Sequence, residues 1–231
     1  MPNPEGSRAG RLLQGMLSGE LSPDLESKIR DLLATEHLYL SATREIATKL
    51  EVLNDEFRYT RDRNPIHSIT TRVKTPRSII AKLTRRGHPV SVESARQNLT
   101  DIAGIRVICP YVDDIYTIAE RLVGQDDVEL VRKVDYIENP KPNGYRSLHL
   151  ILKVPVFLSD RTERVPAEVQ VRTIAMDFWA CLEHDLAYKL TGGKTAAIER
   201  ELRACADVIA DTDRRMQRLH EAIAGSKASA V

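Results

Sequence analysis

Short apolar runs of strand length alternate with helical patterns through the middle of the chain, and this alternation limits the fold more than any other feature. Each run is rich in Val, Ile and Leu, which favour extended backbone in a sheet. The four runs are Gly104–Cys109, Val128–Ile137, Ser147–Val154 and Val165–Val171. Between the first two runs, apolar spacing predicts a helix over Asp113–Val123. Strands mixed with helices indicate an α+β or α/β core, and we expect α+β: a mixed β-sheet flanked by helices.

Helix start signals of one kind occur twice in the first third of the chain. Ser22 as an N-cap, with Pro23 in the first turn, begins a long helix whose apolar spacing continues to about residue 58. Thr75-Pro76 begins a shorter helix by the same pairing, and Gly87 with the Pro that follows at 89 ends it. A long N-terminal helix is therefore expected to precede the sheet.

The chain divides by composition into three parts. At 231 residues it is long enough for one core with helical extensions. Residues 1–20 carry Gly, Pro and Ser, which predicts a flexible N-terminus. Helical spacing returns over Ala175–Leu190. We expect the main domain at 21–190 and a C-terminal helical extension at 191–231.

The C-terminal extension has a heptad pattern. Successive members of one row are alternately four and three residues apart, as on one long helix that packs against another. The row is Ile198, Leu202, Cys205, Ile209, Thr212, Met216, Leu219 and Ile223. It could pack along the N-terminal helix of the same chain or form a subunit interface. Glu36 and Thr43 interrupt the apolar row of the N-terminal helix, so we expect a second subunit to cover part of it and the protein to be a homo-oligomer.

Composition argues against several classes of protein. With 34 basic and 33 acidic residues, the chain has no overall charge for binding polyanions, so any phosphate-binding charge must be local. Its three cysteines are far apart and form no C-x-x-C pair, which fits a reducing compartment better than a disulfide framework or a zinc site. No signal-peptide core and no apolar run of ~20 residues is present. We expect a cytoplasmic protein without a membrane partner.

A cation-rich segment surrounds the start of the short helix. From Arg63 to Val92 there is no Asp or Glu. The candidate ligands are Arg72, Lys74, Arg77, Ser78, Lys82 and Arg85. Ser78, Lys82 and Arg85 share one helical face, and a helix N-terminus among cations suits phosphate oxygens. The alternative is a solvated basic helix whose isoleucines and leucine are buried.

Two carboxylates lie on or beside predicted strands. Asp101 precedes the first strand, and in the last strand Glu168, Gln170 and Arg172 point to one face. Each pattern taken alone is more often a turn residue or a salt-bridged solvent face. Because both carboxylates belong to one predicted sheet, they could hold Mg²⁺ between them, which takes oxygen ligands and substrate phosphates.

Polar side chains crowd the start of the third strand, in the stretch NPKPNGYRSLHLIL. An Asn-Gly turn follows Lys141 and precedes Tyr145, Arg146 and His149. Taken singly, Tyr145 is a surface aromatic. Together with the cations and carboxylates, it predicts a site for two nucleotides and magnesium, where the ring stacks on a purine. Asp177 could accept the paired donors of a guanine edge, or be an acidic residue in a first helical turn. Glu183-His184 has no second His at metal-site spacing, so no zinc is expected there.

Four motifs, RVKTPRSIIAK, DIAGIRV, NGYRSLH and EVQVRTIAMDFWACLEH, resemble in order and spacing the synthetase domain of the RelA/SpoT family. The resemblance runs from about residue 40 to about 190, and the short chain resembles the stand-alone small alarmone synthetases of the RelP/RelQ kind. It implies a nucleotidyltransferase-like fold. It also implies transfer of the β,γ-diphosphate of ATP to the 3′-hydroxyl of GDP or GTP, which makes (p)ppGpp and AMP.

The resemblance assigns a role to each candidate residue. It places ATP on the cation-rich segment, Mg²⁺ on Asp101 and Glu168, and Glu168 beside the 3′-hydroxyl. It assigns GDP or GTP to Lys141, Tyr145, Arg146, His149, Gln170, Arg172 and Asp177, although relatives carry Asn in place of Asp177. It further implies a tetramer, with single-stranded RNA as a candidate regulator.

Two alternatives stay open. One is the same transfer onto an adenine nucleotide or a tRNA 3′ end. The other is a non-catalytic nucleotide- or RNA-binding regulator, which would have little use for the two carboxylates.

Overall fold

A five-stranded mixed sheet forms the centre of the computed structural model, which describes residues 22–60, 63–189 and 195–228. The strands are β1 (Ser68–Val73), β2 (Ala103–Cys109), β3 (Glu129–Asp135), β4 (Leu148–Phe157) and β5 (Thr162–Thr173). Their order is β1-β2-β5-β4-β3, and only the β2–β5 pair is parallel. The predicted mixed sheet flanked by helices is confirmed.

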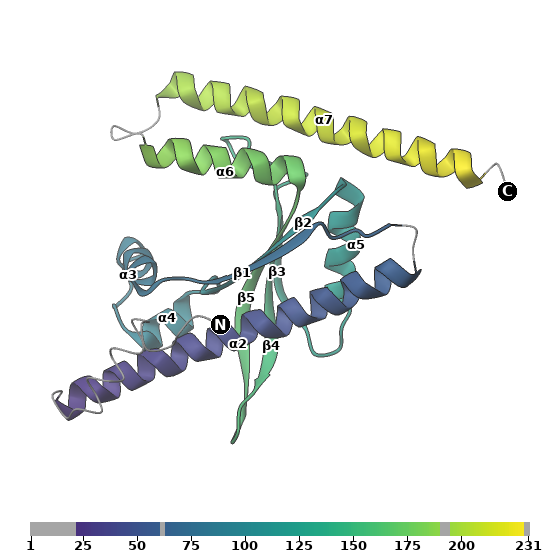
Figure 1. Cartoon of the computed structure of the whole chain (residues 1–231). Coiled ribbons are helices and arrows are strands. Elements are labelled where there is room, and N and C mark those ends of the chain that lie inside the picture. The colour runs from purple at the N-terminus through teal and green to yellow at the C-terminus, as the bar shows by residue number, and fades with distance from the viewer. Residues whose placement is uncertain (1–21, 61–62, 190–194, 229–231) are drawn as a thin grey trace, which may run out of the picture.

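One face of the sheet is apolar and carries the core. On β5, Ala167, Val169 and Val171 are buried on this face. They join a single buried cluster to which α2 (Pro23–Thr60) and α5 (Val112–Val123) also contribute. Helix α2 contacts four of the strands as it crosses the sheet (Figure 1). Because side chains alternate along a strand, the polar residues of β5 are left on the opposite face.

Two short helices connect β1 to β2. Helix α3 (Pro76–Arg85) begins as predicted, because the Thr75 hydroxyl accepts from the backbone N–H of Ser78 at 3.3 Å. The helix ends at Arg85, and Gly87, two residues further on, has a φ of +71° that suits glycine. Helix α4 (Val92–Asn98) and strand β1 were not predicted. β1 is an edge strand rich in Ser and Thr, and α4 has only two turns, so neither gives a clear apolar period.

The last two helices, α6 (Ile174–Lys189) and α7 (Ala196–Ala228), pack against each other. Helix α7 also contacts α5, and Figure 1 shows it on the side of the molecule opposite α2. The alternative that the C-terminal helix packs along the N-terminal helix is therefore wrong. The division at residues 190 and 191 stays a prediction, and residues 1–20 lie outside the described ranges.

The buried row of α7 is one residue further along the chain than the predicted heptad row. Ala206, Ala210 and Asp213 are buried, whereas Cys205 and Met216 of the predicted row are exposed. One residue corresponds to about 100° around a helix. Small side chains allow a close approach here, and Asp213 accepts a 2.6 Å hydrogen bond from the Thr173 hydroxyl. Ile198, Leu202 and Ile209 of the predicted row are half-buried, whereas Met216, Leu219 and Ile223 at its C-terminal end are exposed.

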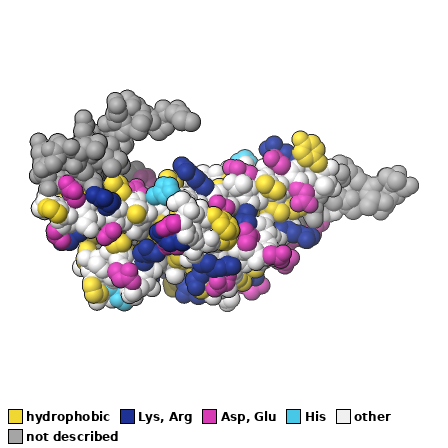
Figure 2. All heavy atoms as spheres, turned by 90° about the horizontal axis from the view of Figure 1, so that it is seen from below, with side chains coloured by type: hydrophobic (Ala, Val, Ile, Leu, Met, Phe, Trp, Pro, Cys, Tyr) yellow, Lys and Arg dark blue, Asp and Glu magenta, His cyan; other side chains and the backbone are white. Residues whose placement is uncertain are grey.

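The distribution of charge on the surface agrees with the nearly equal numbers of basic and acidic residues in the sequence. Figure 2 shows basic and acidic side chains interspersed over the described residues of the face seen from below. Within the described ranges, no helix combines the length and hydropathy that crossing a bilayer would require.

Candidate active site

The candidate residues lie on the polar face of the sheet, in rows that cross its strands. One row runs from Arg72 on β1 through Gly104 on β2 to Glu168 on β5. A neighbouring row runs from Arg106 on β2 through Gln170 on β5. The prediction that Glu168 and Gln170 share a face opposite the valines is confirmed.

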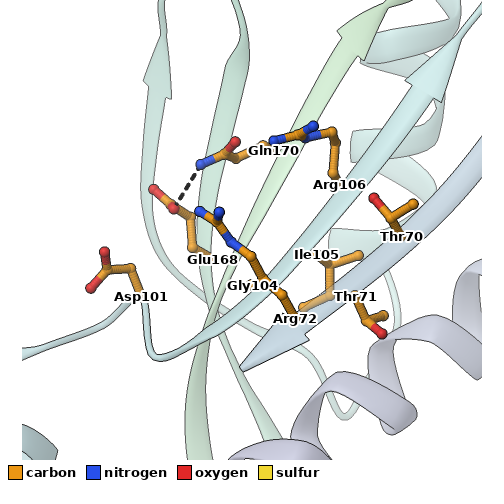
Figure 3. A pocket seen from close by; sticks show the side chains of 9 residues that line it. All are labelled: Thr70, Thr71, Arg72, Asp101, Gly104, Ile105, Arg106, Glu168 and Gln170. Atoms are coloured by element: carbon orange, nitrogen blue, oxygen red, sulfur yellow. Dashed lines mark hydrogen bonds between the residues drawn. The ribbon is translucent and has the colours of Figure 1, made fainter. Parts of the chain in front are cut away.

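A pocket of about 280 Å³ opens over these rows (Figure 3). Its lining includes Asp101 and Glu168, so the two carboxylates predicted from separate motifs are brought together. Gly104 has no side chain, and a Cβ there would lie 3.4 Å from Cγ of Arg72. Arg72 therefore lies over Gly104, and Figure 3 shows its guanidinium directed toward Glu168.

Asp101 is held by two lysines from the cation-rich segment. Its Oδ2 accepts from Nζ of Lys74 and from Nζ of Lys82, each at 2.5 Å. Burial would raise the pKa of Asp101, but these two ammonium groups lower it below its usual range overall. The other oxygen, Oδ1, is buried and has no hydrogen-bond partner among the described residues. Asp101 is thus ionised near neutral pH, with one oxygen left for a ligand.

Glu168 is the end of a hydrogen-bonded chain that crosses from β5 to β4. Its Oε1 lies 3.0 Å from Nδ1 of His149, and its Oε2 accepts from Nε2 of Gln170 at 2.9 Å. Nε2 of His149 lies 2.8 Å from the Tyr145 hydroxyl, which accepts from Arg172 at 2.6 Å. Burial would raise the pKa of Glu168, but His149 and then Gln170 lower it overall. The carboxylate is therefore fixed in orientation and charged.

A second pocket, of about 410 Å³, adjoins the first. Arg72, Arg106 and Gln170 line both pockets, whereas Tyr145 and Arg172 line only the second. Residues of α6 close its far side. Two ligands bound in these pockets would meet beside Gln170 and Glu168.

Asp177, in the first turn of α6, is already engaged by cations. Its Oδ1 accepts from Arg172 at 3.1 Å and pairs with Arg106 at 3.2 Å. Reading of a guanine edge by Asp177 stays a prediction.

The remaining predicted residues fall into three groups. Lys141 lies 4.5 Å from the centre of the Tyr145 ring, at the second pocket. Arg77 and Arg85 are exposed on α3, and the Ser78 hydroxyl is 2.9 Å from that of Thr75. Arg146 turns away from both pockets toward α7.

Sequence reasoning missed Arg106 and Tyr136. The sequence pattern that places Arg106 was present, since Arg106 lies two residues after Gly104 in GIRVIC and therefore points to the same face of the strand. Tyr136 makes edge contacts with Tyr145 and His149, at ring-centre distances of 5.9 and 5.1 Å. It follows the end of β3, where no periodicity marks it.

Guanidinium groups bind phosphates and a tyrosine ring can stack on a base, so the two adjoining pockets suit phosphorylated ligands that carry a base. The carboxylates beside them could hold Mg²⁺, which accompanies such ligands. The family described as "Region found in RelA / SpoT proteins" matches residues 71–193. The chain belongs to this family, as the four motifs predicted.

Two curated relatives of the chain are named GTP pyrophosphokinases. It is 40% identical over 193 residues to YwaC of Bacillus subtilis, covering 84% of this chain and 92% of that protein. It is 34% identical over 191 residues to YjbM of the same organism, covering 83% and 89%.

Solved structures of similar proteins share the fold. Small alarmone synthetase 2 of Bacillus subtilis superposes with a TM-score of 0.75 at 39% identity, covering 83% of this chain and 98% of that one. Small alarmone synthetase 1 of Bacillus subtilis, bound to its product pppGpp, gives a TM-score of 0.74 at 34% identity, covering 80% and 94%.

Proposed function

We propose that the chain is a GTP pyrophosphokinase that moves the β,γ-diphosphate of ATP to the 3′-hydroxyl of GDP or GTP. The products are ppGpp or pppGpp, and AMP. The observation that carries this proposal is the pair of joined pockets with Asp101 and Glu168 in one lining. The relatives named GTP pyrophosphokinase, and the one bound to pppGpp, support it.

ATP is assigned to the pocket next to α3. Lys74 and Lys82 lie at its rim through their contacts with Asp101, and Arg72 lines it. Phosphoryl-type transfer depends mainly on positioning and charge stabilisation, and these cations supply both to the polyphosphate. Arg77, Ser78 and Arg85 are proposed as outer contacts on the same helix.

Magnesium is proposed at Asp101, with Glu168 as a second ligand. The residues fit the ion, because Oδ1 of Asp101 is a buried oxygen with no hydrogen-bond partner in the described part of the chain. Both oxygens of Glu168 have partners, and within the described ranges no group of three metal-binding side chains occurs. Phosphate oxygens and water would have to complete the coordination of the ion, which Mg²⁺ accepts. Bound Mg²⁺ would neutralise charge on the transferred diphosphate.

The guanine nucleotide is assigned to the second pocket. Tyr145 is the candidate for stacking on the base, and Lys141 and Arg172, which lie over its ring, are the candidate cations for phosphates. Asp177 is the candidate reader of the base. Ionised Glu168 accepts the proton of the 3′-hydroxyl. The 3′-oxygen then forms a bond to the β-phosphorus of ATP, the bond from this phosphorus to the α,β-bridging oxygen breaks, and AMP leaves. His149 and Gln170 hold Glu168 in place for this step.

A homo-oligomer, with a tetramer as the expected form, is also proposed. Met216, Leu219 and Ile223 on α7 are 50%, 58% and 59% exposed and form an apolar stripe. A stripe of this kind is typical of a subunit interface. A cytoplasmic location and single-stranded RNA as a regulator are further proposals, which rest on the family resemblance.

The test is an acceptor panel. Purified protein is incubated with magnesium and ATP labelled on the γ-phosphate, together with GDP, GTP, AMP or tRNA in separate reactions. Label is expected on GDP or GTP, AMP should form in equal amount, and chelation of magnesium should stop the reaction. Label on AMP or tRNA alone would favour the alternative acceptor, and no transfer with any acceptor would contradict the proposal.

A further inference from the structure

The turn that carries Tyr145 is built against helix α7. Gly144 has a φ of +90°, and a Cβ there would lie 2.5 Å from Cβ of Ala206. Nη1 of Arg203 donates to the carbonyl oxygen of Pro142 at 3.0 Å. The turn and the helix are therefore in direct contact, with no space for a side chain at Gly144.

Arg146 adds an ionic contact on the other side of Tyr145. Its Nη2 donates to Oδ1 of Asp207 at 2.9 Å, and its Nη1 donates to the carbonyl oxygen of Ala206 at 3.2 Å. The hydrogen bond from Arg146 holds the pKa of Asp207 below its usual range. Both neighbours of Tyr145 in the chain are thus fixed to α7, whereas the Tyr145 side chain faces the second pocket.

Helix α7 is itself fixed to the body of the protein near this contact. Nε1 of Trp179 on α6 donates to the carbonyl oxygen of Leu202 at 3.0 Å. Further along α7, beyond Asp207, the carboxylate of Asp213 accepts a hydrogen bond from the hydroxyl of Thr173, which follows Arg172 at the end of β5. A displacement of α7 would therefore move the backbone on both sides of the Tyr145 ring.

We propose that Ala206 and Asp207 of α7 are positioning residues for the guanine nucleotide, acting through Gly144 and Arg146 on Tyr145. This inference rests on the proposed function, because it takes the second pocket as the acceptor site. It changes the role of Arg146 from a direct ligand to a link between the turn and α7. It also gives the C-terminal helix a part in substrate binding, in addition to any part in assembly.

Asp207→Ala is the first variant, and Asp211→Ala is its matched control. Asp211 lies one turn further along α7 and pairs only with Arg214 and Arg215 of the same helix among the ion pairs of the described residues. In Asp207→Ala the KM for GTP should rise about three- to tenfold, as expected for loss of a partly exposed charged hydrogen bond. The KM for ATP and kcat should stay within about twofold, since the contact does not reach the reacting atoms. Asp211→Ala should behave as the unmodified protein.

Ala206→Leu is the second variant, with Ala204→Leu as its control. Ala206 is buried against Gly144, whereas Ala204 is exposed on the same helix. Ala206→Leu should displace the turn and raise the KM for GTP more than Asp207→Ala does. Asp207→Glu keeps a carboxylate for Arg146, so its KM for GTP should be close to that of the unmodified protein. Melting temperatures of all variants show whether the fold is intact.

Titration calorimetry with GDP separates this inference from the proposed function. Weaker GDP binding by Asp207→Ala and Ala206→Leu, with ATP-analogue binding unchanged, supports the positioning role even if transfer is slow. Equal GDP affinity in variants and controls overturns the inference and leaves the proposed function standing. Absence of GDP binding by the unmodified protein overturns both. An equal loss of affinity for GDP and for the ATP analogue means that α7 supports the fold in general, which also overturns the inference.

Discussion

Glu168→Gln tests the assignment of the proton acceptor most directly. The substitution keeps the size of the side chain and one of its oxygens but removes the charge. In the structure the carboxylate accepts from Gln170 at 2.9 Å and lies 3.0 Å from the ring nitrogen of His149. The amide of Gln can keep one of these contacts, so the pocket should stay formed while the proton acceptor is lost.

The size of the effect follows from the role proposed for Glu168. Proton transfer by a positioned side chain contributes typically about 10²–10⁴-fold in rate. At 1.36 kcal/mol for each factor of ten, this is roughly 3–5 kcal/mol of transition-state stabilisation. The cost to folding should be smaller, because losing one charged hydrogen bond costs about 1.5–3 kcal/mol at most. The rate should therefore fall by about 10²-fold or more in a folded protein that still binds ATP.

Glu163→Gln is a matched control on the same strand. Its side chain is 19% exposed, against 18% for Glu168, but it pairs with Arg96 and Arg161 outside both pockets. Single-turnover transfer from labelled ATP to GTP measures the rate, and calorimetry with an ATP analogue measures binding. Near-normal turnover by Glu168→Gln, or an equal loss in Glu163→Gln, would remove Glu168 from the mechanism.

Three further predictions concern the second pocket, the Asp101 carboxylate and the exposed surface of α7. Tyr145→Ala should raise the KM for GTP about 5- to 150-fold, since stacking on a base contributes ~1–3 kcal/mol. The KM for ATP should rise far less. Equal increases in both KM values would show that the ring supports the fold and does not stack on the guanine base. Lys82→Met should raise the pKa of Asp101, which is now held low, and destabilise the fold at neutral pH by about 1–3 kcal/mol in urea unfolding. A carboxyl group whose pKa is lowered by folding stabilises the folded protein at pH values above its unfolded-state pKa, near 3.9, and this stabilisation is lost in acid. The difference in unfolding free energy between Lys82→Met and the unmodified protein should therefore shrink below about pH 4. A difference that does not depend on pH would contradict the pairing of Lys82 with Asp101. Leu219→Glu should split the assembly into smaller species, as measured by light scattering, because burying one Leu contributes ~1.5–3 kcal/mol. The control Arg218→Glu should leave the assembly intact. A monomeric mass for the unmodified protein at micromolar concentration would refute the interface.

The parts of the fold that could be predicted are those with a strong local signal. Alternation in PAEVQVRT put Glu168 and Gln170 on one face, and the Thr75-Pro76 pair marked the start of α3. The meeting of Asp101 with Glu168 could also be expected, because Asp101 precedes one strand of the sheet and Glu168 lies on another. Their roles in catalysis stay predictions.

What could not be predicted depends on contacts between distant segments. The apolar row of α7 has the better heptad, yet the row with Ala206 and Asp213 is buried. Close approach of the turn at Gly144 and the bond to Thr173 decide this, and neither is visible in the spacing of α7. Arg146 looked like a ligand for the same reason: its partner Asp207 is on a helix far along the chain.

The parallel pairing of β2 with β5 also determines when the two carboxylates meet during folding. Strands β4 and β5 are joined by a short turn between Phe157 and Thr162, so their pairing closes a small loop at little entropic cost. β2 can pair with β5 only after the chain through α5, β3 and β4 has been accommodated, and pairing over such a separation is slow. Asp101 precedes β2 and Glu168 lies on β5, so an intermediate with only the β4–β5 hairpin formed does not bring them together. A nascent chain that has not yet extruded β5 therefore has no complete site, and catalytic competence arises only after this last strand has been synthesised and has paired with β2.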